Sequence, residues 1–462
     1  MSRILVAGLC PLPFENTLQS YGPGIRTWQF AWSLARAGHE VRVLAMRTPG
    51  AYGDQRPAPS EDRKGIAIER LADVAFLDPT TIRRAIRALQ PHALVGASLY
   101  GSAALARAGA RLPFWADQFG SAMAEAQAQA ATFGRDWPVA HAWGLLAPVL
   151  RSCDRLSVVS ELQRGAAVGE LGAVGRLAAK TCGQDLVSVI PCALVPPEEA
   201  PPETGGGAPR VARGTVVPHD AFVVLWSGGF NVWSDVETLV AGAEAAMERD
   251  GRIHLVSTGG AIPGLDAGSY ARFRALVARS PQRERFHLEG WVRAERVASY
   301  VAEADVGVLA ERPTYDGMLG SKTRIVQWMG GGLPVVCSRV GELGHLLAER
   351  QLGLTFPAGD AEALAERLRW AADHAVELRR MAARAGDHAR AELGFEVTTR
   401  PLAAWAAEPR LAPDAGSRRR VRGPLDHATL RQRLAALGRR VPLARRSELL
   451  VELWRRLLGP GG

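Results

Sequence analysis

The chain has 462 residues, more than one hydrophobic core usually organises, which predicts two domains. Hydrophobic residues make up 47% and charged residues 22% of it, which excludes a disordered, collagen-like or coiled-coil chain. The net charge of +9 belongs to the end of the chain, because residues 410–462 hold 13 arginines against four acids, so the body is near neutral and we expect no nucleic-acid partner.

The five cysteines show no paired spacing and no cluster with histidine, so we expect buried free thiols and neither a disulfide framework nor a zinc site. The apolar run within residues 1–13 is far too short to cross a membrane, and it continues directly into patterned sequence. We therefore expect a cytoplasmic protein.

From the N-terminus, short apolar runs alternate with longer helical segments, the pattern of β/α units. The expected strands cover residues 4–8, 41–46, 93–97, 113–117 and 155–159. The expected helices cover residues 25–37, 79–89, 102–108 and about 121–151. Ser160 follows the fifth strand and has the side chain that caps helix N-termini, so a further helix should begin there.

Residues 196–218 are rich in Pro and Gly and poor in large apolar side chains, as expected of an interdomain linker or a solvent loop. The alternation then starts again, with elements expected at residues 222–227, 235–249, 253–258, 286–289, 292–303, 305–310, 321–329, 334–338 and 360–375. Two such runs predict two doubly wound, Rossmann-like α/β domains facing a cleft, with ligands beyond the carboxyl ends of the strands. The loops expected there follow Gly8, Asp117, Ser227 and Ala310.

We accordingly divide the chain into a first domain (1–195), a linker (196–218), a second domain (219–408) and a basic helical tail (409–462). Within the tail, leucines recur at helical intervals among arginines. Such basic amphipathic helices can lie on a membrane that carries a lipid-linked acceptor, and packing back onto the body is the alternative.

Two glycine loops each stand between an expected strand and an expected helix. One contains Gly22 and Gly24, and the other contains Gly228 and Gly229 with Asn231 close by. Backbone amides at a helix N-terminus can receive a phosphate, so one loop from each domain could hold a diphosphate, although each alone can also be a simple turn. Neither loop has the spacing of a dinucleotide fingerprint or a P-loop.

The segment 310–342 places two cations, Lys322 and Arg324, at the start of a helix, followed by the glycine run 330–332 and a buried strand. Cations in a first helical turn oppose the helix dipole, so their position requires an explanation other than helix stability. A bound diphosphate would supply that explanation, and the alternative is that both side chains point outward into solvent.

These segments together resemble the family-four retaining glycosyltransferases, which have the GT-B fold and use nucleotide-sugar donors without a metal. The resemblance covers most of residues 1–405. It is carried, in the family's order, by GPGIRTWQFAWSLARAGHEVRV (22–43), SGGFNVWSDVETLVAG (227–242), FHLEGWVRAERVASYVAEADVGVL (286–309), KTRIVQWMGGGLPVVCS (322–338) and GLTFPAGDAEALAERL (353–368).

The resemblance implies roles for single positions. Gly24 matches the glycine-loop position near the donor phosphates, and Gly229 with Asn231 lies where the family approaches the diphosphate. Val292 matches the position whose backbone reads the nucleobase, and Arg324 matches the cation at the helix entry.

Other positions depart from the family. Gln327 stands at the second glutamate of the pair that commonly holds the donor ribose, and Leu319 stands at the first. No cation occurs in residues 230–234, where the family usually has an Arg/Lys pair, so the diphosphate charge should be met by Arg324, Lys322 or Arg26.

Phe119 stands where the family often has an active-site histidine, with Asp117 two residues earlier. Against a subgroup with similar departures, Asp316 matches an acidic position and Asp235 a loop aspartate. Asp117 is expected either to contact substrate or to cap a turn. Asp316 is expected either to act at the site or to be a solvated loop acid. Asp235 is expected to cap the following helix.

The sequence thus predicts a retaining, metal-independent glycosyltransferase that moves a sugar from a nucleotide-sugar to a sugar, lipid-linked or small-molecule acceptor, with no cofactor. The expected catalytic residues are Asp117, Arg324 and Asp316, and the expected donor-binding residues are Gly24, Arg26, Gly228, Gly229, Asn231, Val292, Lys322 and Gln327. A catalytically weakened shell that only binds nucleotide-sugars is the main alternative, and a nucleotide-sugar epimerase is the third.

Overall fold

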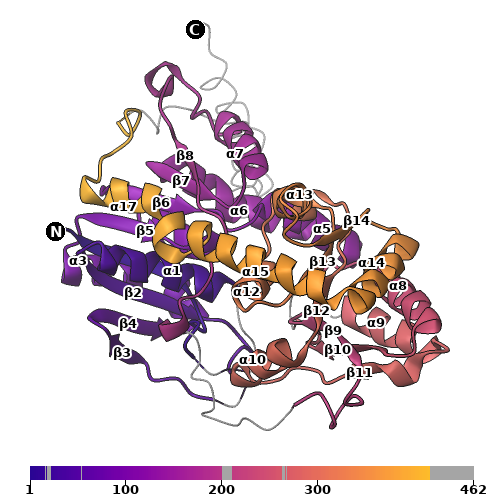
Figure 1. Cartoon of the computed structure of the whole chain (residues 1–462). Helices are drawn as coiled ribbons and strands as arrows, with labels where there is room; N and C mark the ends of the chain where they lie inside the picture. Colours follow the sequence, from indigo (N-terminus) through magenta and orange to yellow (C-terminus); the bar gives the residue numbers. More distant parts are fainter. Residues whose placement is uncertain are drawn as a thin grey trace, which may run out of the picture.

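The structure, a computed structural model, describes residues 1–15, 17, 22–53, 55–199, 211–262, 266 and 268–416. It has two α/β units, each built on its own sheet (Figure 1). Most of the expected tail, including the amphipathic helices, and much of the expected linker lie outside the described residues. Within the described residues, no helix combines the length and the apolar character that crossing a bilayer requires.

The first domain has an eight-stranded sheet in the order β3-β4-β2-β1-β5-β6-β7-β8, parallel except for the β3–β4 pair. Its strands are β1 (Arg3–Cys10), β2 (Glu40–Arg47), β3 (Ser60–Arg63), β4 (Ile66–Leu71), β5 (Ala93–Gly96), β6 (Phe114–Asp117), β7 (Arg155–Val158) and β8 (Val187–Val189). Its helices are α1 (Gly22–Arg36), α2 (Asp73–Leu77), α3 (Pro79–Leu89), α4 (Ser98–Ala108), α5 (Ala122–Phe133), α6 (Trp137–Ser152) and α7 (Glu161–Ala173). Strand order reverses between β1 and β5, which places a ligand crevice at the carboxyl ends of these strands.

The second domain has a six-stranded, fully parallel sheet in the order β11-β10-β9-β12-β13-β14. Its strands are β9 (Phe222–Ser227), β10 (Ile253–Thr258), β11 (Phe286–Leu288), β12 (Val306–Leu309), β13 (Val335–Ser338) and β14 (Leu354–Phe356). Its helices are α8 (Val236–Arg249), α9 (Gly268–Arg279), α10 (Ala294–Glu303), α11 (Tyr315–Leu319), α12 (Thr323–Gly330), α13 (Gly341–Glu349) and α14 (Ala361–Asp373). The central strands are short buried apolar runs because helices cover both faces.

The end of the described chain returns to the first domain. Helix α15 (Ala375–Glu392) packs on α12, and then α16 (Phe395–Thr398) and α17 (Arg400–Ala407) pack against α1. In Figure 1, α15 lies between the two units and α17 lies beside β5 and β6. Leu402 is fully buried, and the ring of Trp405 lies 5.5 Å from that of Trp115. The segment 219–408 therefore ends in helices that complete the core of the first domain.

Local signals set several helix ends. Asp235 caps α8 as expected, since its carboxylate accepts hydrogen bonds from the backbone N–H and the hydroxyl of Thr238 (3.2 and 2.7 Å). Ser160 caps α7 by accepting from the N–H of Gln163 (3.0 Å). The single helix expected over 121–151 is instead the pair α5 and α6, because Gly134 adopts the left-handed conformation (φ +62°) that ends α5.

Candidate active site

A cavity of about 440 Å³ lies between the two domains at the carboxyl ends of their strands. The first domain contributes the start of α1, the loop after β6 and the beginning of α5. The second domain contributes the loops after β9, β10, β11 and β12 and the N-terminal turn of α12. The site is thus composite, and neither domain forms it alone.

The loop after β9 brings bare backbone to the cavity. Gly228 has φ +89°, and a Cβ atom there would lie 2.9 Å from Nη2 of Arg324. The backbones at Gly228 and Gly259 also pack closely, because a Cβ atom on Gly259 would lie 1.8 Å from the carbonyl oxygen of Gly228. This turn therefore requires glycine, and its backbone lines the cavity beside Arg324.

Arg324, in the first turn of α12, lines the cavity and is only partly satisfied. Its Nη2 donates to the carbonyl oxygen of Gly229 (2.9 Å), and its guanidinium lies 4.8 Å from the ring centre of Trp226. Its buried Nη1 has no hydrogen-bond partner among the described residues, and burial lowers the pKa of the guanidinium to about 10. A buried N–H donor with no acceptor favours binding of an anion at this position.

Lys322 is, in contrast, already neutralised. Its Nζ forms an ion pair with the buried carboxylate of Glu311 (2.8 Å) and lies 4.4 Å from the ring centre of Trp233. Burial acts against the charged form of Lys322, but the charges of Glu311 and Asp316 outweigh it and raise the pKa of the lysine. Of these two cations at the start of α12, Arg324 is therefore the one with a free hydrogen-bond donor among the described residues.

Two further carboxyl groups face the cavity from opposite domains. Asp316 lies on α11 of the second domain, and Glu125 lies on α5 of the first. Burial, together with the charge of Asp316, raises the pKa of Glu125 to about 7, and burial also raises the pKa of Asp316.

The structure brings eight of the eleven expected site residues to the cavity. These are Gly228, Gly229, Asn231, Val292, Asp316, Lys322, Arg324 and Gln327. The other three, Gly24, Arg26 and Asp117, are not among its lining residues.

Asp117 and Arg26 are fully buried because they bind each other. The Asp117 carboxylate accepts from Nη2 and Nε of Arg26 (2.7 and 3.1 Å) and from the N–H of Ser98 (2.9 Å). Arg26 also donates to the backbone carbonyls of Ile190 and Pro191, where the chain leaves the first domain. The expected catalytic role of Asp117 and the expected phosphate contact of Arg26 are therefore replaced by a structural ion pair.

Gly24 serves packing inside the first domain. A Cβ atom at Gly24 would lie 1.8 Å from the carbonyl oxygen of Pro11, so only glycine lets α1 approach this loop. Its neighbours Gly22 and Pro23 reach the cavity instead.

Gln327 lines the cavity, but its amide is occupied. Its Nε2 donates to the carbonyl oxygen of Ala193 (2.8 Å), and its Oε1 accepts from the N–H of Val195 (3.3 Å). Both residues lie on the segment that leads out of the first domain. Gln327 therefore binds the segment that connects the two domains to α12. This structural role differs from the ribose contact expected from the sequence.

Sequence reasoning missed several lining residues. Glu125 lies in an Ala-rich helix whose sequence gives no sign that it faces the second domain. Thr258 ends β10 and has a buried hydroxyl with no partner in the described part of the chain, a position that the rule on strand carboxyl ends could have indicated.

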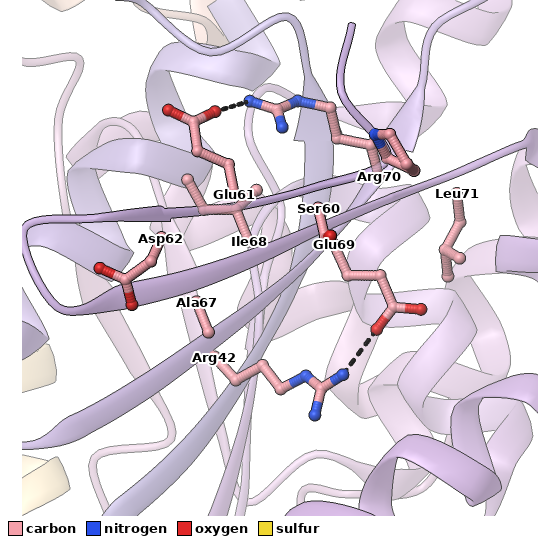
Figure 2. A pocket seen from close by; sticks show the side chains of 10 residues that line it. Arg42, Ser60, Glu61, Asp62, Ala67, Ile68, Glu69, Arg70 and Leu71 are labelled. Atoms are coloured by element: carbon pink, nitrogen blue, oxygen red, sulfur yellow. Dashed lines mark hydrogen bonds and ion pairs between the residues drawn. The ribbon is translucent and has the colours of Figure 1, made fainter.

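A larger hollow of about 710 Å³ lies over β2, β3 and β4 of the first domain, away from the cleft. Figure 2 shows that its two arginines are paired with carboxylates: Arg42 with Glu69 (2.7 Å) and Arg70 with Glu61 (2.6 Å). Because these charges satisfy each other, we assign the site to the smaller interdomain cavity. Over the described residues, no group of three or more His, Cys, Asp or Glu side chains is placed to hold a metal ion.

Comparison with known proteins finds a family model that matches the second domain. Residues 221–374 match the family model described as glycosyl transferases group 1. No curated protein matches the chain.

Solved structures match over nearly the whole chain. Sucrose-phosphate synthase from Thermosynechococcus elongatus aligns with a TM-score of 0.66 at 18% identity, over 88% of this chain and 99% of that one. HepE from Anabaena, in complex with UDP-glucose, aligns with a TM-score of 0.59 at 15% identity, over 88% and 100%. An α,α-trehalose-phosphate synthase from Burkholderia xenovorans, in complex with glucose-6-phosphate, aligns with a TM-score of 0.61 at 13% identity, over 88% and 100%. The chain has the two-domain GT-B fold.

Proposed function

We propose that this chain, which carries a group 1 glycosyltransferase domain on a GT-B fold, transfers a sugar from a nucleotide-sugar donor to an acceptor hydroxyl. The observation that carries the proposal is Arg324, which lines the interdomain cavity beside the Gly228–Gly229 turn and whose buried Nη1 has no acceptor among the described residues. A donor diphosphate supplies the missing acceptor.

In the proposed reaction, the bond between the anomeric carbon and the diphosphate oxygen breaks, and negative charge grows on that oxygen. Arg324 and the backbone N–H groups at the start of α12 stabilise this charge. Lys322 is already paired with Glu311, so it makes no direct bond to the diphosphate. The acceptor hydroxyl then attacks the anomeric carbon from the same face, and the released phosphate oxygen takes its proton.

We further propose that transfer retains the anomeric configuration and needs neither a metal nor a cofactor. HepE is described in complex with UDP-glucose and the Burkholderia enzyme with glucose-6-phosphate, which supports a nucleotide-sugar donor and a sugar acceptor for this chain. We place the reaction in the cytoplasm, in the synthesis of a glycan, glycolipid or glycosylated metabolite. Contact of the basic tail with a membrane stays a prediction about residues outside those described.

A donor screen followed by a turnover assay tests the proposal. Thermal-shift titration with UDP-, GDP- and dTDP-sugars should reveal one base that stabilises the chain, because a ligand that binds only the folded state raises its stability. Mass spectrometry should then detect release of the nucleoside diphosphate and a glycosylated product, and NMR should show retention. Donor binding without turnover across a broad acceptor panel would contradict transfer and leave a protein that only binds nucleotide-sugars.

A further inference from the structure

The cavity holds a pair of carboxyl groups that the proposed handling of the diphosphate does not use. Glu125 comes from α5 of the first domain, and Asp316 comes from α11 of the second. The two helices pack against each other, so both side chains line one end of the same cavity. Donor and acceptor must meet between these two walls.

Neither carboxyl group has a cation of its own. The side chain of Asp316 is nearly inaccessible (8% exposed), and no hydrogen bond or ion pair joins it to another residue in the described part of the chain. Glu125 accepts one long hydrogen bond from Nε2 of Gln129 (3.3 Å). The nearest cation, Lys322, is paired with Glu311.

The arrangement leaves negative charge uncompensated. Arg324 is directed to Gly229 and, in the proposed function, to the donor diphosphate, which brings further negative charge into the cleft. Burying unpaired carboxylates is costly, which agrees with the raised pKa values of Glu125 and Asp316. A neutral hydroxyl would satisfy hydrogen bonds there but would bring no positive charge to the two carboxyl groups.

We infer that Glu125 and Asp316 bind a protonated amine on the sugar substrate, so that the enzyme acts on an amino sugar or aminocyclitol; this rests on the proposed function. An ammonium group has N–H donors for both carboxylates and supplies the positive charge that the described residues do not. The two residues are specificity determinants, and they come together only when both domains face each other.

Calorimetric titration of the full chain, with the nucleoside diphosphate from the donor screen present, tests the inference. One set of probes is glucose and its 2-, 3-, 4- and 6-amino-deoxy analogues. A second set compares the affinity for a nucleotide-linked amino sugar with that for the nucleotide-linked neutral sugar. We expect one amino form to bind about tenfold or more tightly than its hydroxyl parent, because hydrogen bonds to charged groups are the stronger class. The free probes report an amine on the acceptor, and the nucleotide-linked pair reports an amine on the transferred sugar.

Isosteric variants separate charge from shape. Glu125→Gln and Asp316→Asn keep hydrogen-bonding capacity but lose the charge, so each should remove the preference for the amine while leaving the affinity for the nucleoside diphosphate. Glu170→Gln, a variant of another glutamate with a burial-raised pKa that does not line the cavity, should keep the preference. Equal binding of amino and hydroxyl forms in every arm, or a preference that survives both charge-removing variants, would overturn the inference. If the unmodified chain does not bind the nucleoside diphosphate, the proposed function itself is overturned.

Discussion

Replacing Asp117 with Asn should unfold the first domain more easily without a specific effect on chemistry. The carboxylate receives two hydrogen bonds from Arg26, one from the hydroxyl of Ser157 (2.7 Å) and one from the N–H of Ser98, and both charged side chains are fully buried. Removing one partner of a buried ion pair leaves the other charge uncompensated, at a cost of about 3–5 kcal/mol. Since domains are typically stable by only about 5–15 kcal/mol, this is a large fraction of the total.

Differential scanning calorimetry should show a fall of about 10 °C in the melting temperature, the shift expected for several kcal/mol in a domain of this size. Below that temperature, the folded variant should keep the donor KM and most of kcat. In a double-mutant cycle with Arg26→Gln, the second substitution should cost much less than it does alone, because the two residues act as one unit. A variant with unchanged melting and a kcat lowered by orders of magnitude would refute the structural assignment and restore a catalytic Asp117.

Two further substitutions test the cleft. Glu125→Gln should stabilise the chain at pH 8 and have little effect at pH 5. Burial and the charge of Asp316 raise the pKa of this acid from 4.5 to about 7, against an opposing effect of Lys322, and Tyr100 is a further titratable neighbour. The folded state is therefore penalised as pH rises through this window, by up to about 3 kcal/mol above it. Equal melting shifts at both pH values would contradict this. Gln327→Leu should cost about 1–3 kcal/mol of stability, since it leaves the backbone groups of Ala193 and Val195 unpaired, while titration should show unchanged affinity for the nucleoside. A large loss of nucleoside affinity with normal melting would indicate a ribose contact.

The periodicity of the sequence was sufficient to predict the fold class. The expected strands 222–227 and 253–258 and the expected helix 79–89 match β9, β10 and α3 to the residue, because short apolar runs and capping residues are local signals. The caps at Asp235 and Ser160 were predictable for the same reason. The break between α5 and α6 also had a local signal, Gly134, which the long Ala-rich pattern concealed.

The return of α16 and α17 to the first domain has no local signal, since it depends on which surface their apolar faces meet. The same limit applies to the site. Arg324 and the Gly228–Gly229 turn were placed correctly in the cleft by their position after a strand and at a helix start. Asp117 also stands at the carboxyl end of a strand, but its partner Arg26 is 91 residues away in sequence, so only the folded chain shows that the carboxylate is already paired. Gln327 and Glu125 likewise take their roles from the other domain.

Calorimetric titration of the nucleoside diphosphate into the wild-type chain and into Arg324→Ala tests the central claim most directly. The claim predicts that the wild-type chain binds and that the variant binds ~10- to 100-fold more weakly, the range expected when a hydrogen-bonded charge is removed. Arg272→Ala, which removes an exposed arginine on α9 paired with Glu237, should bind like the wild type. Equal affinity of wild type and Arg324→Ala, with both folded, would contradict the account.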